Sequence, residues 1–132
     1  MKIVINRCFG SFGLSYKAVM RYAEIKGIKL YAYADDLFEE YVPKEGEKEP
    51  FIVYYYTKQR TGNNKEDNKN FFMDNNIDRT DLALVQVVEE LKEEANTSCS
   101  ELKVVDIPDN IEYEIDNYDG LESIHEMHRT WY

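Results

Sequence analysis

One stretch near the start of the chain decides the fold that we expect: Lys2-Ile3-Val4-Ile5-Asn6-Arg7-Cys8-Phe9-Gly10-Ser11-Phe12-Gly13-Leu14-Ser15. Its three consecutive apolar residues predict a buried strand over 2–8. The glycine-containing segment after them predicts a turn. Ser15 is a good N-cap, because its hydroxyl can accept a hydrogen bond from a free amide of the first helical turn. The stretch therefore predicts a strand that runs through a glycine-rich loop into a helix.

The residues that follow continue this pattern. Apolar side chains at helical spacing predict a helix over 16–26, and Gly27 suits the left-handed C-cap that ends it. Residues 28–34 alternate in the manner of a half-covered strand. Strand, helix and strand within 34 residues predict a βαβ unit, whose crossover should be right-handed if its strands are parallel.

The rest of the chain adds one long helix, further strands and two long loops. A helix begins after Thr80 or Asp81, either of which can cap it. Proline, glycine and polar residues predict loops over 35–50 and 58–70. We expect strands over 51–57, 71–73, 102–107 and 111–115, a turn over 118–120 and a last short helix over 121–127.

These elements predict one α/β or α+β domain over residues 1–132. Its core would be a single compact mixed sheet of about five strands, with two main helices and a short C-terminal helix. The length of 132 residues fits one domain. No apolar run approaches the roughly 20 residues of a membrane span, and the apolar start is too short for a signal peptide. We expect a cytosolic protein with two free thiols, Cys8 and Cys99.

Charge is unevenly distributed along the chain. The net charge is −10, yet residues 1–34 carry six Lys or Arg against one Glu, a net of +5, whereas residues 81–132 carry −11. Such a chain as a whole would be repelled by nucleic acid, so no direct nucleic-acid binding is expected. The acidic half has two interpretations. It keeps the protein in solution, or its carboxylates imitate phosphates and occupy a nucleic-acid-binding groove of another protein.

The glycine-rich loop is the first candidate site. A strand-to-helix turn exposes backbone amides and the positive end of a helix dipole, which favour phosphate or carboxylate. The ligand-binding residues expected here are Arg7, Gly10, Ser11, Gly13 and Ser15. Their spacing is neither a P-loop nor a dinucleotide fingerprint. The structural alternative is a tight turn whose glycines allow Phe9 and Phe12 to pack.

The C-terminal residues His128, Arg129 and Trp131 form the second candidate set. Arginine can bind a phosphate through two donors, and tryptophan can stack on a base. In the structural alternative, Trp131 closes the core and Arg129 pairs with a carboxylate. His125 and His128 lack enough neighbouring ligands for a metal site, and we expect no metal and no cofactor.

Eleven tyrosines suggest a third feature. Tyr54, Tyr55 and Tyr56 follow one another in an expected strand, so they must point to both of its faces. Tyrosine is enriched at protein interfaces, so a partner surface or a homo-oligomer is one explanation, and a helix-covered sheet is the other. No Ser-His-Asp order or tuned pair of carboxylates favours catalysis.

The sequence resembles small bacteriophage and prophage proteins of unknown function. The resemblance rests on residues 2–15, on Arg79-Thr80-Asp81-Leu82-Ala83-Leu84-Val85-Gln86-Val87-Val88-Glu89-Glu90-Leu91, on Tyr118-Asp119-Gly120-Leu121-Glu122 and on His128-Arg129-Thr130-Trp131. Departures occur at Ser11, Leu82 and Lys92, where we expect Gly, Pro and Gly. The resemblance implies an accessory protein in the cytosol of a bacterial host, and proteins of that kind often act against host defence.

Three functional hypotheses follow. The first is a non-enzymatic protein that binds a phosphorylated small ligand, a nucleotide, and counters host defence. The second is an acidic inhibitor that imitates nucleic acid, as some anti-CRISPR proteins do, and binds a host defence protein or another nucleic-acid enzyme. The third is a small hydrolase or transferase.

Overall fold

The computed structural model describes residues 1–34 and 39–127. Within them it has seven strands and three α-helices, which confirms the α/β class. Two 3-10 turns flank the last helix. The elements are β1 (Lys2–Asn6), α1 (Tyr16–Lys26), β2 (Tyr31–Ala34), β3 (Val53–Tyr56), α2 (Asn64–Asn68), β4 (Phe71–Phe72), η1 (Asp74–Asn76), α3 (Leu82–Leu91), η2 (Lys92–Ala95), β5 (Leu102–Asp106), β6 (Tyr113–Tyr118) and β7 (Leu121–Glu126).

The strands form three small sheets, so the prediction of one mixed sheet is wrong. The sheets are β1–β5, β2–β3–β4 and β6–β7, and every strand pair is antiparallel. β1 and β2 lie in different sheets, so the expected βαβ unit does not form. Its two strands find distant partners instead: Val4 lies opposite Val104 and Ala32 lies opposite Tyr55.

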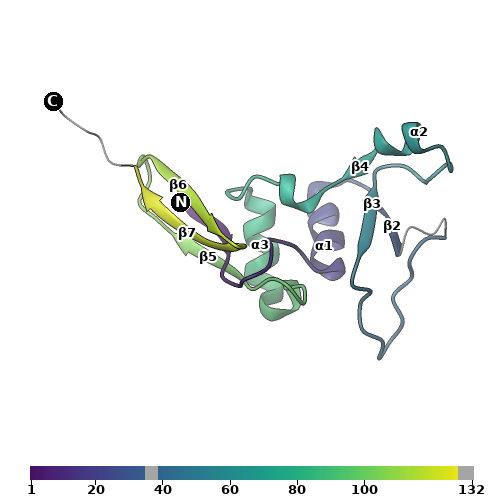
Figure 1. Ribbon diagram of the computed structural model, residues 1–132, viewed down its shortest axis with the longest axis horizontal. Coiled ribbons are helices and arrows are strands. Elements are labelled where there is room, and N and C mark those ends of the chain that lie inside the picture. Colours follow the sequence, from purple (N-terminus) through teal and green to yellow (C-terminus); the bar gives the residue numbers. More distant parts are fainter. Residues whose placement is uncertain (35–38, 128–132) are drawn as a thin grey trace.

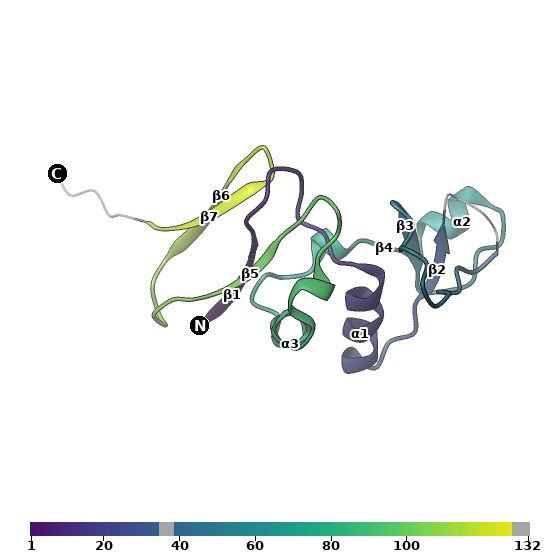
Figure 2. The same ribbon diagram turned by 90° about the horizontal axis from the view of Figure 1, so that it is seen from below.

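Helices α1 and α3 lie between the sheets (Figures 1 and 2). α3 packs against β1 and β5, and α1 lies between α3 and the sheet β2–β3–β4. One continuous apolar cluster joins these layers, from Val4 and Leu84 on one side to Leu30 and Tyr55 on the other. The helices of the described residues are too short or too polar to cross a membrane.

Both long helices begin as their sequences predict, and α1 also ends where expected. The Ser15 side chain accepts a hydrogen bond from the Ala18 amide, and Gly27 ends α1 at φ 71°. Asp81 caps α3 by accepting from the amides of Ala83 and Leu84. α3 ends at Lys92, whose φ of 54° favours glycine. This is one of the positions where the resemblance leads us to expect Gly.

The C-terminal segment differs from the prediction. Residues 121–126 form strand β7, not a helix. Asp119 and Gly120 take positive φ values of 49° and 91°, which makes a tight turn back from β6. Ile115 and Ile124 then face each other across the hairpin. The cross-strand pairs of this hairpin override the local helical spacing.

The two expected loops differ from each other. Residues 39–50 contain no strand or helix, and residues 35–38 lie outside the described part. Residues 58–70 contain the short helix α2, whose start is capped by the Asn63 side chain. Asp67 of this helix is buried and accepts hydrogen bonds from the amide and hydroxyl of Thr61.

Candidate functional site

The glycine-rich loop continues β1 along β5 and then turns against the β6–β7 hairpin. The Arg7 amide donates to the Glu101 carbonyl at 2.7 Å, and the Gly10 amide donates to the Asp119 carbonyl at 2.9 Å. Gly10 has a φ of 146°, and a Cβ atom there would overlap the Cys99 carbonyl oxygen. The loop therefore needs glycine for close backbone packing.

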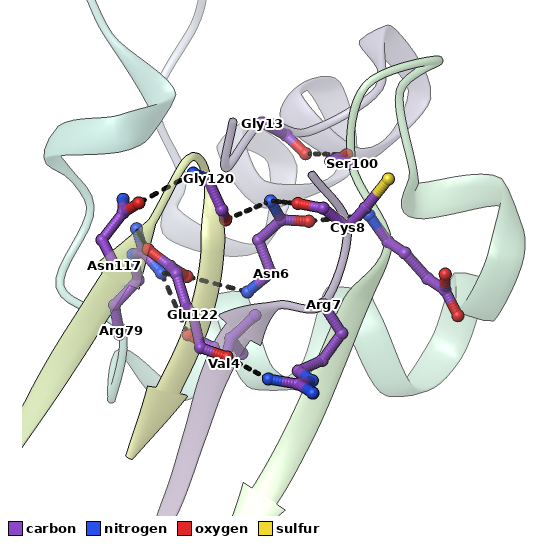
Figure 3. A network of polar contacts seen from close by, with 11 residues as sticks. Val4, Asn6, Arg7, Cys8, Gly13, Arg79, Ser100, Asn117, Gly120 and Glu122 are labelled. Carbon is purple, nitrogen blue, oxygen red and sulfur yellow. Dashed lines mark hydrogen bonds and ion pairs between the residues drawn. The ribbon is translucent and has the colours of Figure 1, made fainter. Parts of the chain in front are cut away.

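A buried polar junction lies beside this loop (Figure 3). Asn6, which is fully buried, donates from its side-chain amide to the carbonyls of Cys8 and Gly120 at 2.9 and 2.8 Å. Its side-chain oxygen accepts from the Glu101 amide at 2.8 Å. One asparagine thereby ties the glycine-rich loop to β5 and to the hairpin turn.

Arg79 and Glu122 form the charged part of the junction. Two guanidinium nitrogens donate to the two Glu122 carboxylate oxygens at 2.6 and 2.9 Å. The backbone amide of Asn6 donates a third hydrogen bond to Glu122 Oε1 at 2.8 Å. The Arg79 guanidinium also stacks on Phe12 at 3.5 Å. Sequence reasoning did not select Asn6, Arg79 or Glu122, although all three lie in the stretches that carry the resemblance. No buried side-chain nitrogen or oxygen of this junction lacks a hydrogen-bond partner, which indicates a structural role.

The expected ligand-binding residues are not gathered at one place. Arg7 donates to the Glu122 carbonyl at 2.6 Å, on the hairpin side. The Ser15 hydroxyl, at the start of α1, donates to the Glu94 carbonyl at 2.6 Å. The Gly13 carbonyl accepts from Ser100 and the Ser11 amide donates to Cys99, so both take part in loop packing. His128, Arg129 and Trp131 lie outside the described residues.

Most of the basic side chains of the first third pair with carboxylates of the acidic half. Lys2 pairs with Glu89 at 2.9 Å, Lys17 with Glu94 at 2.7 Å and Arg21 with Glu90 at 2.9 Å. The hydrogen bond from Arg21 lowers the pKa of Glu90. Lys26 pairs with Asp81, and the N-terminus with Asp106 and Asp109. Four of the six basic side chains of residues 1–34 therefore have the protein's own carboxylates as partners.

The amides at the start of α1 also have partners within the chain. The Leu14 amide donates to the Asp74 carboxylate at 2.8 Å, and the Tyr16 amide donates to the Glu49 carboxylate at 2.7 Å. Two carboxylates from distant segments thus lie where we expected a ligand phosphate. A helix start does attract anions, and here side chains supply them.

A cavity of about 520 Å³ opens beside these carboxylates. Its walls come from the start of α1, the segment 49–53, strand β4 and the segment 96–98. The aromatic residues lining it are Tyr16, Phe51, Tyr55, Phe71 and Phe72, with Glu49 and Asp74 as the charged ones. Its volume lies within the range of small-molecule sites.

Tyr55 is the unusual residue of this cavity. Its side chain is only 7% exposed, and its hydroxyl makes no hydrogen bond to any residue in the described part of the chain. Burial, and then the negative charges of Asp74 and Glu49, raise the pKa of Tyr55. The hydroxyl of a largely buried tyrosine usually has a hydrogen-bond partner, and a ligand in the cavity would supply one here.

The hairpin carries a second cluster on its outer face. Ser123 Oγ and Asp116 Oδ2 lie 2.9 and 3.2 Å from the same atom, Nε2 of His125. A catalytic relay needs the serine on one ring nitrogen and the carboxylate on the other. This cluster therefore does not have the geometry of a hydrolase site.

The same hairpin face is acidic. Glu112, Glu114 and Asp116, which we call the acidic strip, are exposed and alternate with the less exposed Ile111, Tyr113 and Ile115. Alternate residues of a strand point to the same side, about 7 Å apart. Glu112 and Glu114 form no ion pair with any described residue, so the strip keeps most of its charge.

Comparison with protein-family models, with curated proteins and with solved structures gives no match to this chain.

Proposed function

We propose that the chain is a binding protein that takes a small ring-bearing ligand of nucleoside size in the cavity beside the start of α1. One observation carries this proposal: the Tyr55 side chain, only 7% exposed, lines that cavity, and its hydroxyl has no hydrogen-bond partner among the described residues. A ligand in the cavity would give this hydroxyl the hydrogen bond that no described residue supplies.

The aromatic walls support a ring as the part of the ligand that enters. Phe72 lies on β4 directly opposite Tyr55 and so shares its face of the sheet, and Tyr16 lies at the start of α1. Aromatic side chains can stack on any nucleobase, since every base has a π-face. The ligand is still the nucleotide expected from the sequence, but the protein would hold it by its base instead of its phosphate.

Binding without turnover is part of the proposal. It is supported by the geometry of the Ser123–His125–Asp116 cluster, which does not allow a proton relay. The phage or prophage setting, and an action on host defence by removing a nucleotide signal, remain proposals that rest on the resemblance.

Ligand-dependent thermal stability tests the proposed function. Nucleosides, mononucleotides and cyclic dinucleotides are added in turn, and a bound ligand should raise the melting temperature with its concentration. Tyr55→Phe should weaken the response, whereas Tyr54→Phe should leave it unchanged, because Tyr54 points to the other face of β3. If no compound raises the melting temperature, the proposal is wrong.

A second function is favoured by a different observation, the acidic strip. Its carboxylates project from an exposed hairpin, while four of the six basic side chains of the first third already have carboxylate partners. We propose as an alternative that this face docks on a basic nucleic-acid-binding groove of a host protein.

Capture of a host partner tests this alternative. The partner should be released at high salt, because the attraction between exposed charges is screened. A variant with Glu112→Gln and Glu114→Gln should lose the partner. The matched control is Glu45→Gln with Glu47→Gln, two exposed residues of the segment 39–50. A partner that binds both variants equally would contradict the alternative.

A further inference from the structure

The charged groups of the cavity are hydrogen-bond acceptors. Asp74 uses one carboxylate oxygen on the Leu14 amide, and Glu49 uses one on the Tyr16 amide. The second oxygen of each carboxylate makes no hydrogen bond to a described residue. An ionised carboxylate can only accept, so both atoms would be matched by donors on a ligand.

Positive charge is absent from the cavity walls in the described part of the chain. None of the residues lining it is Lys, Arg or His. The field of the two carboxylates reaches the cavity wall, because both raise the pKa of the Tyr55 hydroxyl. Glu49 acts in the same direction on Tyr16, after burial and Tyr41. A phosphate would be repelled here, whereas an amino group would be attracted.

Tyr55 completes the set of polar groups. Its hydroxyl can donate one hydrogen bond and accept another, unlike the two carboxylates. A base with an exocyclic amino group beside a ring nitrogen can donate to a carboxylate and accept from this hydroxyl. Adenine and cytosine have that arrangement. Uracil has a carbonyl oxygen at the corresponding position, and this oxygen would face a carboxylate.

We propose that the cavity selects a nucleoside whose base carries an exocyclic amino group next to an unprotonated ring nitrogen. The amino group donates to Asp74 or Glu49, and the Tyr55 hydroxyl donates to the ring nitrogen. The 5′-phosphate lies outside the cavity and contributes no affinity. This inference rests on the proposed function, since it names the ligand chemistry of the same cavity.

Matched ligand pairs test the inference by titration calorimetry. Cytidine and uridine differ at the amino position, as do adenosine and inosine. Cytidine and adenosine should each bind at least about tenfold tighter than their partners, as expected for one good polar contact to a base. Cytidine 5′-monophosphate should bind no tighter than cytidine.

Variants separate the contributions. Asp74→Asn keeps an oxygen for the Leu14 amide and should reduce the cytidine-to-uridine ratio. Glu49→Gln should also reduce this ratio. Glu49 lies on an exposed segment, so its substitution should not unfold the protein. Tyr55→Phe should weaken cytidine binding, with Tyr54→Phe as the matched control. Circular dichroism and urea unfolding of each variant identify any loss of fold.

The possible outcomes are distinct. If nucleosides bind but cytidine equals uridine, or if the monophosphate binds at least about tenfold tighter than cytidine, the inference is wrong and the proposed function stands. An unchanged ratio in both Asp74→Asn and Glu49→Gln also contradicts it. If no nucleoside or nucleotide binds, the inference and the proposed function both fail.

Discussion

The backbone of Gly120, in the β6–β7 turn, lies directly against the backbone of Gly10 in the glycine-rich loop. A Cβ atom added to Gly120 would overlap the Gly10 carbonyl group. The Gly10 amide also donates to Asp119, the residue before Gly120, at 2.9 Å. Two glycines that are 110 residues apart in the sequence therefore allow the hairpin to dock on the end of β1.

Gly120→Ala should lower the free energy of unfolding by at least about 3 kcal/mol, because the new methyl group meets backbone and Gly120 has a positive φ. Gly46→Ala is the matched control. Gly46 also has a positive φ, of 81°, but nothing lies within 4 Å of its added Cβ. It should cost only about 1–2 kcal/mol. Urea unfolding measures both, and equal losses would contradict the packing argument.

Lys92→Gly should stabilise the protein by about 1 kcal/mol, because φ at this position is 54° and glycine takes that conformation without steric cost. Lys103→Gly, on the exposed side of β5, should instead destabilise by about 0.5–1 kcal/mol. Thermal and urea unfolding of the two variants give the comparison. A loss of stability in Lys92→Gly would show that its side chain contributes more than its backbone costs.

Glu122→Gln should destabilise the protein by about 3 kcal/mol or more, because it leaves the Arg79 guanidinium largely buried without its counter-charge. The side chain of Glu122 is 4% exposed and that of Arg79 is 18% exposed. Replacing both residues, as Arg79→Met with Glu122→Leu, should recover much of the loss. A double-mutant cycle by urea unfolding measures the coupling, and additive losses would contradict it.

Alkaline pH should weaken the contact between helices α1 and α3 that Tyr22 makes. Its hydroxyl donates to Asp81 at 2.9 Å. Burial, and then Asp81, raise the pKa of Tyr22 to about 12. The folded state thus holds this proton more tightly than the unfolded chain, whose tyrosines titrate near 10. The stabilisation that the protonated Tyr22 hydroxyl contributes is complete below about pH 10 and declines from about pH 10 to about pH 12.

Tyr22→Phe keeps the ring and removes the titrating group, so it isolates this contribution. Relative to the variant, the original protein should lose part of its stability advantage between about pH 10 and pH 12. Urea unfolding at several pH values measures the difference. A difference that stays constant over this window would show that Tyr22 has the same pKa in both states.

Tyr55→Phe should leave stability unchanged or raise it by up to about 1 kcal/mol, because it removes a hydroxyl that makes no hydrogen bond to a described residue. The control Tyr54→Phe should stay within about 0.5 kcal/mol. Urea unfolding without ligand measures both. A loss above about 1 kcal/mol in Tyr55→Phe would mean that the hydroxyl is satisfied in the free protein.

Local signals predicted much of the secondary structure. The strand at Lys2, the helix from Tyr16 and the helix from Leu82 were all expected, and so were the Ser15, Gly27 and Asp81 caps. Each depends on side chains within a few residues of one another, which sequence spacing reveals directly. The short strand Phe71–Phe72 was also expected, as a hairpin partner of the strand before it.

Long-range pairing is where the predictions failed. β1 was expected beside β2 but pairs with β5, and residues 121–126 formed a strand because β6 lies beside them. The candidate site failed to assemble for the same reason. Sequence reasoning identified the start of α1 as attractive to anions, yet Glu49 and Asp74, which reach it, lie 33 and 60 residues away from their amide partners.

The glycine-rich loop shows which features depend on the local sequence and which depend on tertiary structure. By itself, the sequence determined the two long helices, the caps at their starts and a glycine-rich loop between β1 and α1. Only the tertiary structure decided that this loop holds the β6–β7 hairpin, that most basic side chains of the first third pair with the acidic half, and that Tyr55 lines a cavity. The physical reason is that caps and periodicity act over a few residues, whereas strand pairing, ion pairs and cavities depend on segments that meet only after the chain has folded.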